Sequence, residues 1–287
     1  MHDSAPIPSD LEPLDRLARF AFERAPSLCR PEHGCTDYHR VWSAIRLFDL
    51  GGATPGGWPF FRRELQALPA DRPLRVLLSG AADTGLASIV AAALPPERAL
   101  IVLTDRCETP IAQNQRFAQA LGRPLECHVG DVRALACDPV DAVLAHSFLV
   151  FFEPQARQQV VDAWARALRP GGRLLMSNRL VAGGAAVRPP PDTDAAIARL
   201  PALRERAAAA GWNATECDLL AEAAARFWTR SLLAPLTETA LRGLLSGAGL
   251  ELLALEYDDS EAPTGPMSRR HRSRERARAE IVARKPG

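Results

Sequence analysis

The sequence has almost no lysine: Lys285 is the only one among its 35 basic residues. Such reliance on arginine, beside much alanine and proline, is typical of a GC-rich bacterial genome. The 35 basic and 34 acidic side chains nearly cancel, so no strong overall field draws the chain to nucleic acid or to a membrane. No apolar run approaches the roughly 18 residues of a membrane span. The first 25 residues carry acids and prolines where a signal peptide would be apolar, and we expect a cytoplasmic protein.

The six cysteines are too few for a disulfide scaffold at this length. One short segment nevertheless gathers four side chains that bind metals elsewhere: Cys29, His33, Cys35 and His39. Zinc takes such nitrogen and sulfur ligands, but this spacing matches no common zinc signature. We therefore interpret the segment as a loop that enters a helix, and we expect no metal.

The pattern of apolar residues predicts helices first and an alternation of strands and helices later. The first 70 residues have apolar side chains at helical spacing. After them, short apolar runs predict strands at 74–79, 99–104, 124–129, 140–147 and 172–177. Helices are expected between these runs at 84–94, 109–121 and 153–168. Strands without alternation, separated by helices, are typical of a parallel sheet buried on both faces. The sequence thus predicts an α/β doubly wound fold.

The segment 181–235 interrupts this alternation, and we expect its helices, 193–210 and 214–229, to join the N-terminal cover. The chain then returns to the sheet with a helix and two strands, expected at 237–249, 251–259 and 274–285. The last two strands are predicted to form an antiparallel hairpin that completes a mostly parallel, seven-stranded sheet. We therefore divide the chain into a helical substrate-cap region, 1–70, and a core, 71–287, that carries the helical insertion.

Three motifs follow the first three strands, at the edge where open α/β sheets bind their ligands. Gly80-Ala-Ala-Asp-Thr-Gly85 is a loop of mostly small residues that lets the backbone approach a ligand beside a helix N-terminus. Asp105 ends the second strand, where a carboxylate can accept both hydroxyls of a ribose. Asp131 follows the third strand. Either aspartate has helix capping as its alternative role, but the combination indicates a nucleotide site.

With these motifs the chain resembles the class I S-adenosylmethionine-dependent methyltransferases. The segment Leu168-Arg-Pro-Gly-Gly-Arg-Leu-Leu175 and the order of the C-terminal elements add to the resemblance, which covers about 74–180 and 237–285. The last strand of that family's sheet is antiparallel. The resemblance implies S-adenosylmethionine as cofactor and methyl transfer to an O- or N-nucleophile of a small molecule. Because the sulfonium is already activated, such catalysis is mainly positional.

The resemblance also implies roles for individual residues. The loop around Gly80 would hold the methionine part of the cofactor, Asp105 the ribose, and Asp131 with Val132 the adenine. The expected cofactor-binding residues are Gly80, Ala81, Ala82, Asp83, Asp105, Arg106, Asp131, Val132 and His146. In that family an acid usually lies two residues before the first glycine, where this chain has Leu78. Asp83 is the candidate to replace that carboxylate.

Two histidines are the candidate catalytic residues. His146 ends the fourth strand, and an unshifted histidine has a pKa near 6.5, which suits a general base. The alternative for His146 is a place in the lining of the cofactor site. His39 is the second candidate, and it lies on a polar, aromatic helix face with Tyr38, Trp42 and Arg46. We expect these four residues to contact substrate, with packing beneath the cover as the alternative.

Other functions fit parts of the sequence. The same fold serves enzymes that use the cofactor for other reactions, and a member with an altered loop can be a non-catalytic partner subunit. A nicotinamide dehydrogenase fits less well, because the loop lacks the second glycine needed beside a pyrophosphate. The arginines of 268–278 are compatible with phosphate contacts, but half of them fit one solvated or salt-bridged face of a strand. We expect a small-molecule substrate and no nucleic-acid or membrane partner. The long helical N-terminal region is compatible with a homodimer.

Overall fold

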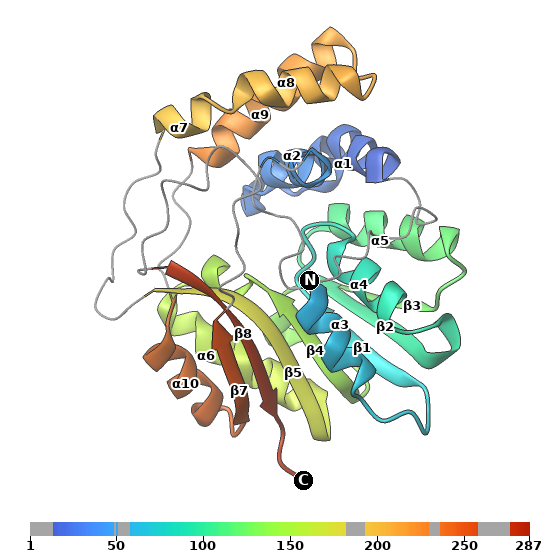
Figure 1. Ribbon diagram of the computed structural model, residues 1–287, viewed down its shortest axis with the longest axis vertical. Helices are drawn as coiled ribbons and strands as arrows, with labels where there is room; N and C mark the ends of the chain where they lie inside the picture. Colours follow the sequence, from blue (N-terminus) through green and yellow to red (C-terminus); the bar gives the residue numbers. More distant parts are fainter. Residues whose placement is uncertain (1–13, 49, 51–57, 182–192, 230–235, 258–275) are drawn as a thin grey trace, which may run out of the picture.

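The computed structural model describes residues 14–48, 50, 58–181, 193–229, 236–257 and 276–287. The strands are β1 (Leu74–Ser79), β2 (Ala99–Asp105), β3 (Leu125–Val129), β4 (Val140–His146), β5 (Leu168–Val181), β6 (Leu236–Thr237), β7 (Glu251–Tyr257) and β8 (Arg276–Arg284). They form one sheet in the order β3-β2-β1-β4-β5-β8-β7, with β6 beside β5 (Figure 1). The pairs among β1 to β6 are parallel, and β8 runs antiparallel to both β5 and β7. The predicted doubly wound fold with an antiparallel last strand is confirmed.

The α-helices and 3-10 turns surround this sheet. The helices are α1 (Leu14–Leu28), α2 (Thr36–Leu47), α3 (Trp58–Gln66), α4 (Gly85–Ala93), α5 (Glu108–Ala120), α6 (Pro154–Ala167), α7 (Thr193–Ile197), α8 (Leu200–Ala209), α9 (Ala214–Trp228) and α10 (Glu238–Gly247). The 3-10 turns are η1 (Pro31–His33), η2 (Pro96–Arg98), η3 (Val132–Ala134) and η4 (Leu149–Phe151). None of the helices in these ranges is long and apolar enough to cross a membrane.

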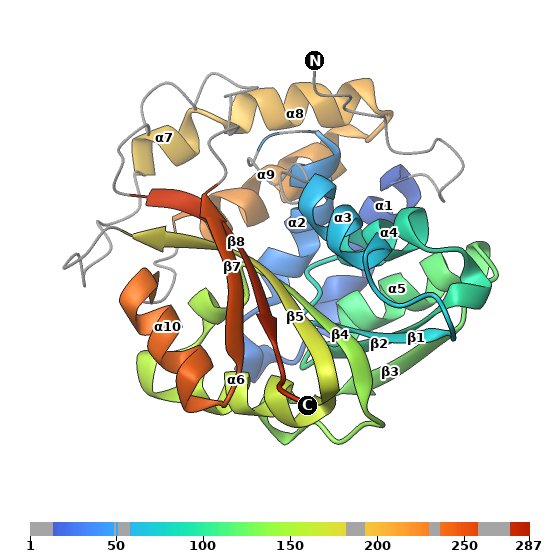
Figure 2. The same ribbon diagram turned by 60° about the horizontal axis from the view of Figure 1, so that its bottom comes forward.

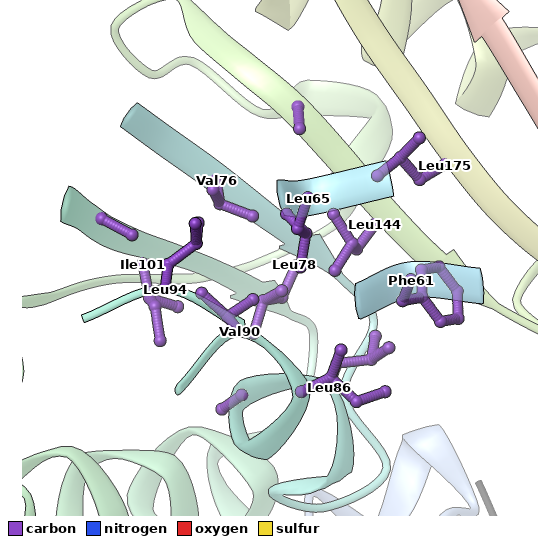
Figure 3. Packing of buried hydrophobic residues seen from close by; sticks show 14 of the residues in the cluster. Phe61, Leu65, Val76, Leu78, Leu86, Val90, Leu94, Ile101, Leu144 and Leu175 are labelled. Atoms are coloured by element: carbon purple, nitrogen blue, oxygen red, sulfur yellow. The ribbon is translucent and has the colours of Figure 1, made fainter. Parts of the chain in front are cut away.

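Buried apolar residues pack against both faces of the sheet. On one face, Phe61 and Leu65 of α3 and Val90 of α4 pack with Val76 and Leu78 of β1 (Figure 3). On the other face, side chains of α6 and α10 pack against β4, β5 and β8. A parallel strand buried on both faces needs a continuous apolar run, which is what the sequence of β1 provides. The core thus lies where the periodicity predicts it.

The strand β5 is longer than predicted. The residues Arg169-Pro-Gly-Gly172 fall between the expected helix 153–168 and the main part of the expected strand 172–177, but they belong to β5. Two observations explain the difference. The register between β4 and β5 shifts between Val140 and Ala142, which accommodates extra residues as a bulge. In addition, backbone hydrogen bonds join Gly171 and Gly172 to Lys285 in the C-terminal segment.

The N-terminal helices and the insertion form a helical cap with a core of its own. Helices α1 and α2 pack against α8 and α9 through a separate buried cluster that includes Phe22, Ile45, Leu203 and Trp212. The cap lies at one edge of the sheet (Figures 1 and 2). Helix α3 packs instead with the sheet core, through Phe61 among others, although it falls within the predicted cap region. The predicted insertion helices are present, the first as two pieces, α7 and α8.

One expectation about the last strand holds only in part. The alternation of alanine and arginine in β8 predicted a solvated or salt-bridged polar face. Arg284 is 45% exposed and pairs with Glu251, but Arg278 is only 3% exposed. β8 lies between β5 and β7, which pair with both of its edges, and the Arg278 side chain lies against His146 of β4 and Ser177 of β5. Most of the arginine-rich run, up to residue 275, lies outside the described residues. The buried Arg278 side chain instead enters the candidate site.

Candidate functional site

The loop after β1 curls against the end of β2. Gly80 has a φ of +73° and donates its N–H to the carbonyl of Thr104, 3.0 Å away. The Phe148 ring lies against this glycine: a Cβ built on Gly80 would come within 2.1 Å of Phe148 Cε2. The next residue, Ala81, donates its N–H to the Asp105 carboxylate over 3.0 Å. The loop thus needs glycine for its backbone conformation and for the close approach of an aromatic ring.

Replacing Gly80 by alanine is expected to lower the free energy of unfolding by about 2 to 3 kcal/mol, from the left-handed φ and the overlap together. Gly122 is a matched control, because its φ is +60° but a Cβ there meets nothing within 4 Å. Gly122→Ala is expected to cost only about 1 kcal/mol. Urea unfolding of both variants measures the difference. Equal losses would show that contact with Phe148 plays no part.

Asp105 has both carboxylate oxygens turned to backbone donors. Oδ2 accepts from the N–H of Ala81 at 3.0 Å, and Oδ1 accepts from the N–H of Cys107 at 2.8 Å. Burial raises the pKa of this carboxyl, while the charge of His39 and the two backbone bonds act in the opposite direction. Each carboxylate oxygen has two acceptor sites. The geometry therefore fixes the carboxylate and leaves acceptor capacity for hydroxyl groups.

Asp83 and Arg46 form a buried ion pair between the loop and the cap. Arg46 Nε of α2 lies 2.5 Å from Asp83 Oδ2, and the two side chains are 10% and 6% exposed. Asp83 Oδ1 accepts the N–H of Gly85 over 2.7 Å, so the carboxylate also fixes the start of α4. Arg46 was expected to contact substrate and Asp83 the cofactor. The structure pairs them with each other, which ties α2 to the loop after β1.

The third strand edge is more exposed. Asp131 accepts from the backbone N–H of Arg133 at 2.9 Å and so caps the turn η3. The Arg133 guanidinium bonds the same carboxylate and, as the largest cause, lowers its pKa. Val132 is 4% exposed, and Arg106 is an exposed residue whose guanidinium donates to the carbonyl of His33 at 3.2 Å. The capping alternative for Asp131 is therefore realised, and its side chain still lies at the carboxyl end of β3.

His146 ends β4 in a buried, positively charged environment. Its Nε2 lies 3.2 Å from Arg278 Nη1, which is a hydrogen-bond donor, so the imidazole nitrogen is the acceptor. Burial, followed by the charges of Arg278 and Arg179, lowers the pKa of His146 to about 3. A neutral imidazole with its Nε2 already engaged is a weak general base near neutral pH. This environment favours the alternative role, a residue that lines the site.

The low pKa of His146 predicts a pH dependence of stability. Its pKa is about 3 when folded and about 6.5 when unfolded. Below pH 6.5 the unfolded chain therefore binds more protons, and stability falls as the pH falls towards 3. Relative to His146→Gln, the wild type should lose about 2 kcal/mol of unfolding free energy between pH 6.5 and pH 5. Urea unfolding at both pH values measures this. Parallel pH profiles for the two proteins would contradict it.

Aromatic residues from three elements meet beside the cap. The ring of Tyr38 on α2 lies 5.4 Å from Trp42, 5.1 Å from Phe227 of α9 and 5.8 Å from Phe151 of η4. We call these four residues the aromatic cluster. Burial, with the negative charges of Asp83 and Asp105, raises the pKa of Tyr38 well above its usual value. Its hydroxyl therefore stays protonated and can donate a hydrogen bond.

His39 lies in a different environment from the one expected for a catalytic base. It is 5% exposed, and its Nδ1 is 3.5 Å from Cys29 Sγ. Cys35 and Cys107 complete this group, and we call these four residues the cysteine–histidine cluster. His33, which the sequence pattern grouped with them, is not a member of the cluster.

Sequence reasoning missed several residues of the site, among them Ser147, Phe148 and Arg278. Ser147 has a φ of +49°, an uncommon conformation for a residue other than glycine, and donates its N–H to the carbonyl of Ser177. This turn directs Phe148 onto Gly80. Arg278 reaches His146 from the last strand. Phe148 could have been noticed, because it is a large apolar residue directly after the His-Ser that ends the fourth strand. No local sequence feature indicates that Ser147 or Arg278 belongs to the site.

Comparison with known proteins gives two kinds of similarity. A family model described as a methyltransferase domain matches residues 77–172. The carboxy-S-adenosyl-L-methionine synthase of Chromohalobacter salexigens is 26% identical to this chain over 181 residues. That match covers 59% of this chain and 58% of the relative, so the chain spans less than two thirds of that protein.

Solved structures share the fold at low sequence identity. The [4+2]-cyclase SpnF superposes with a TM-score of 0.57 and 14% identity, covering 88% of this chain and 95% of the cyclase. The 1,6-didemethyltoxoflavin-N1-methyltransferase of Burkholderia thailandensis, solved with 1,6-didemethyltoxoflavin and S-adenosylhomocysteine, gives 0.53 and 18% identity. It covers 96% of this chain and 92% of that enzyme. At such identities the similarity establishes the arrangement of the elements.

Proposed function

We propose that the protein is an S-adenosylmethionine-dependent methyltransferase of the class I type, and the match of residues 77–172 to a methyltransferase-domain family model supports this proposal. Its acceptor in this proposal is an O- or N-nucleophile of a small organic molecule. The observation that carries the proposal is the position of Asp105, fixed at the end of β2 beside the Gly80 loop. The expected resemblance from sequence and the family match agree on this segment.

The residues at the sheet edge fit the cofactor. Asp105 keeps acceptor sites for two ribose hydroxyls, and the small residues Gly80 to Ala82 expose backbone next to it. The helix α4 starts directly after the loop, so its N-terminal N–H groups favour a carboxylate nearby. Asp83 is neutralised by Arg46 and is less suited to hold an ammonium group than the sequence suggested. We therefore assign the ammonium contact to backbone carbonyls of the loop.

Catalysis in this proposal is mainly positional. When bound, S-adenosylmethionine supplies a methyl group on a sulfonium that is already activated. The protein then has to align the acceptor and exclude water. His146 holds a neutral ring at the end of β4, and Arg278 fixes that ring through Nε2. We assign His146 a positioning role toward the acceptor.

The aromatic cluster is the proposed acceptor contact. Tyr38 and Trp42 project from α2, the same helix that Arg46 ties to the Gly80 loop. Aromatic faces suit a flat or cationic organic molecule, and the protonated Tyr38 hydroxyl adds one donor. The cap, formed by α1, α2, α8 and α9, would thereby supply the acceptor specificity, while the sheet edge binds the cofactor.

The proposal is tested by turnover with methyl-labelled S-adenosylmethionine and a mixture of small metabolites. The expected result is release of S-adenosylhomocysteine together with label in one metabolite. Tyr38→Phe keeps the ring but loses the hydroxyl, and it should raise KM for the acceptor by about tenfold, the value of one hydrogen bond. Arg204→Ala, on the outer face of the cap, serves as the control. Binding of the cofactor without any labelled product from the mixture would count against methyl transfer.

A second candidate function follows from one comparison. The C. salexigens relative is named a carboxy-S-adenosyl-L-methionine synthase, an activity in which S-adenosylmethionine itself is converted. The buried Arg278 and the exposed Arg179 place two positive charges near His146, which suits an anionic co-substrate. The same labelling experiment separates the two functions, because conversion of the cofactor leaves the label on a modified S-adenosylmethionine and releases no S-adenosylhomocysteine.

A further inference from the structure

Four potential metal ligands converge beneath the cap. The ligand atoms of Cys29, Cys35, His39 and Cys107 all lie within 4.8 Å of one another. Cys29 Sγ is 3.4 Å from Cys107 Sγ and 3.5 Å from His39 Nδ1. All four residues are buried, at 2% to 8% exposure. Three buried thiols and one buried imidazole make a compact donor set.

We propose that the cysteine–histidine cluster is a structural zinc site. In a tetrahedral Zn²⁺ site, bond lengths of about 2.3 Å to sulfur and about 2.0 Å to nitrogen place two sulfurs about 3.8 Å apart and a sulfur and a nitrogen about 3.5 Å apart. The observed separations lie close to these values. Three cysteines and one histidine, all buried, match the four-ligand coordination of structural zinc rather than an open catalytic site. The site replaces the catalytic role that sequence suggested for His39.

The local structure explains how distant residues meet. Cys29 follows the last turn of α1, and its N–H still donates to the carbonyl of Ala25. The turn η1 and Gly34, with a φ of +59°, reverse the chain so that Cys35 returns to Cys29 before α2. His39 follows one turn later, on the same side of α2. Cys107 arrives from the core, directly before α5.

Surrounding groups support a charged ligand set. Thr109 Oγ1 lies 3.2 Å from Cys29 Sγ and is suited to donate to a thiolate. A disulfide between Cys29 and Cys107 would use only two of the four groups. It would not explain why Cys35 and His39 converge on the same point. A tetrahedral ion uses all four.

The position of the site gives it a consequence for ligand binding. Three ligands belong to the cap, and Cys107 belongs to the core two residues after Asp105, whose carboxylate accepts the Cys107 N–H. A metal ion would therefore link α1 and α2 to the loop that carries Asp105. Its removal should loosen the cap and displace that loop. The inference itself does not depend on the proposed methyl transfer.

The first test measures zinc in the full chain, purified without a metal-chelating tag from a zinc-supplemented culture. Elemental analysis should give about one zinc ion per chain. Cys35→Ser and Cys107→Ser should each fall below about one tenth of that content, because a structural site needs all its ligands. Cys137→Ser is the control, since Cys137 lies outside the cluster, and it should keep the full content. Full zinc content in both cluster variants would place the metal elsewhere and overturn the proposal.

A second test does not require the variants to fold. Wild-type protein stripped with a chelator and titrated with Co²⁺ should show intense visible absorption of a tetrahedral thiolate complex, saturating at one equivalent and lost on addition of Zn²⁺. No Co²⁺ absorption, or a disulfide between Cys29 and Cys107 in protein purified without reductant, would overturn the proposal.

Discussion

Arg46→Ala is expected to lower the free energy of unfolding by about 4 kcal/mol, because it leaves a buried charge without its partner. Asp83 is 5% exposed, and besides Arg46 its side chain accepts the N–H of Gly85. The substitution should destabilise both elements that the pair joins. The cap loses its ion pair with the core through α2, and the Gly80 loop loses its contact with the Arg46 side chain. Chemical unfolding at neutral pH measures the effect.

Two further variants test whether the lost stability comes from the unpaired buried charge. Arg204→Ala breaks a comparable ion pair with Asp218, but both side chains are exposed, at 44% and 64%, so the loss should stay below about 1 kcal/mol. The double variant Arg46→Ala/Asp83→Ala should be more stable than Arg46→Ala alone, since it removes the unpaired charge as well. A double variant that is as unstable as the sum of the single ones would contradict the pairing.

Asp105→Ala is expected to weaken binding of S-adenosylhomocysteine by about 100-fold. Two hydrogen bonds from ribose hydroxyls to a charged acceptor are worth about 1.5 to 3 kcal/mol each, so a 100-fold loss is a conservative expectation. The variant also leaves the N–H groups of Ala81 and Cys107 without their acceptor. Titration calorimetry gives the affinity, and the circular dichroism spectrum shows whether the variant folds.

Asp138→Ala is the matched control for Asp105→Ala. Asp138 is an exposed acid in the loop before β4, at the opposite end of the sheet from the site. Its removal changes the net charge in the same way and should leave the affinity unchanged. A folded Asp105→Ala protein that binds S-adenosylhomocysteine as tightly as the wild type would show that Asp105 does not bind the ribose.

The fold could be predicted from the sequence because the apolar residues of its core form local patterns along the chain. The apolar run of β1 coincides with the observed strand at both ends, and the small-residue loop with Asp105 marks the ligand edge. The extent of β5 could not be predicted, since its Pro-Gly-Gly segment becomes strand only by pairing with Lys285, more than a hundred residues later. Local signals contain no information on such partners.

The site was less predictable for the same reason. Arg46 pairs with Asp83 and Cys107 meets Cys29 across 78 positions of sequence, so neither partner is visible in a motif. The sequence grouped His33 with the cysteines by spacing alone, and the fold selects Cys107 instead. The alternating pattern of β8 gave no sign that Arg278 would be buried beside His146. A cytoplasmic location and the absence of a nucleic-acid partner stay predictions from the sequence.

The central claim is that the carboxyl edge of β1 and β2 binds S-adenosylmethionine. Calorimetric titration of the wild-type protein with S-adenosylhomocysteine tests it most directly, with a separate titration with NAD for comparison. The account predicts one site per chain with micromolar affinity for S-adenosylhomocysteine and no measurable heat with NAD. Binding of NAD alone would assign the edge to a dehydrogenase, and no binding of either nucleotide by the folded protein would contradict the account.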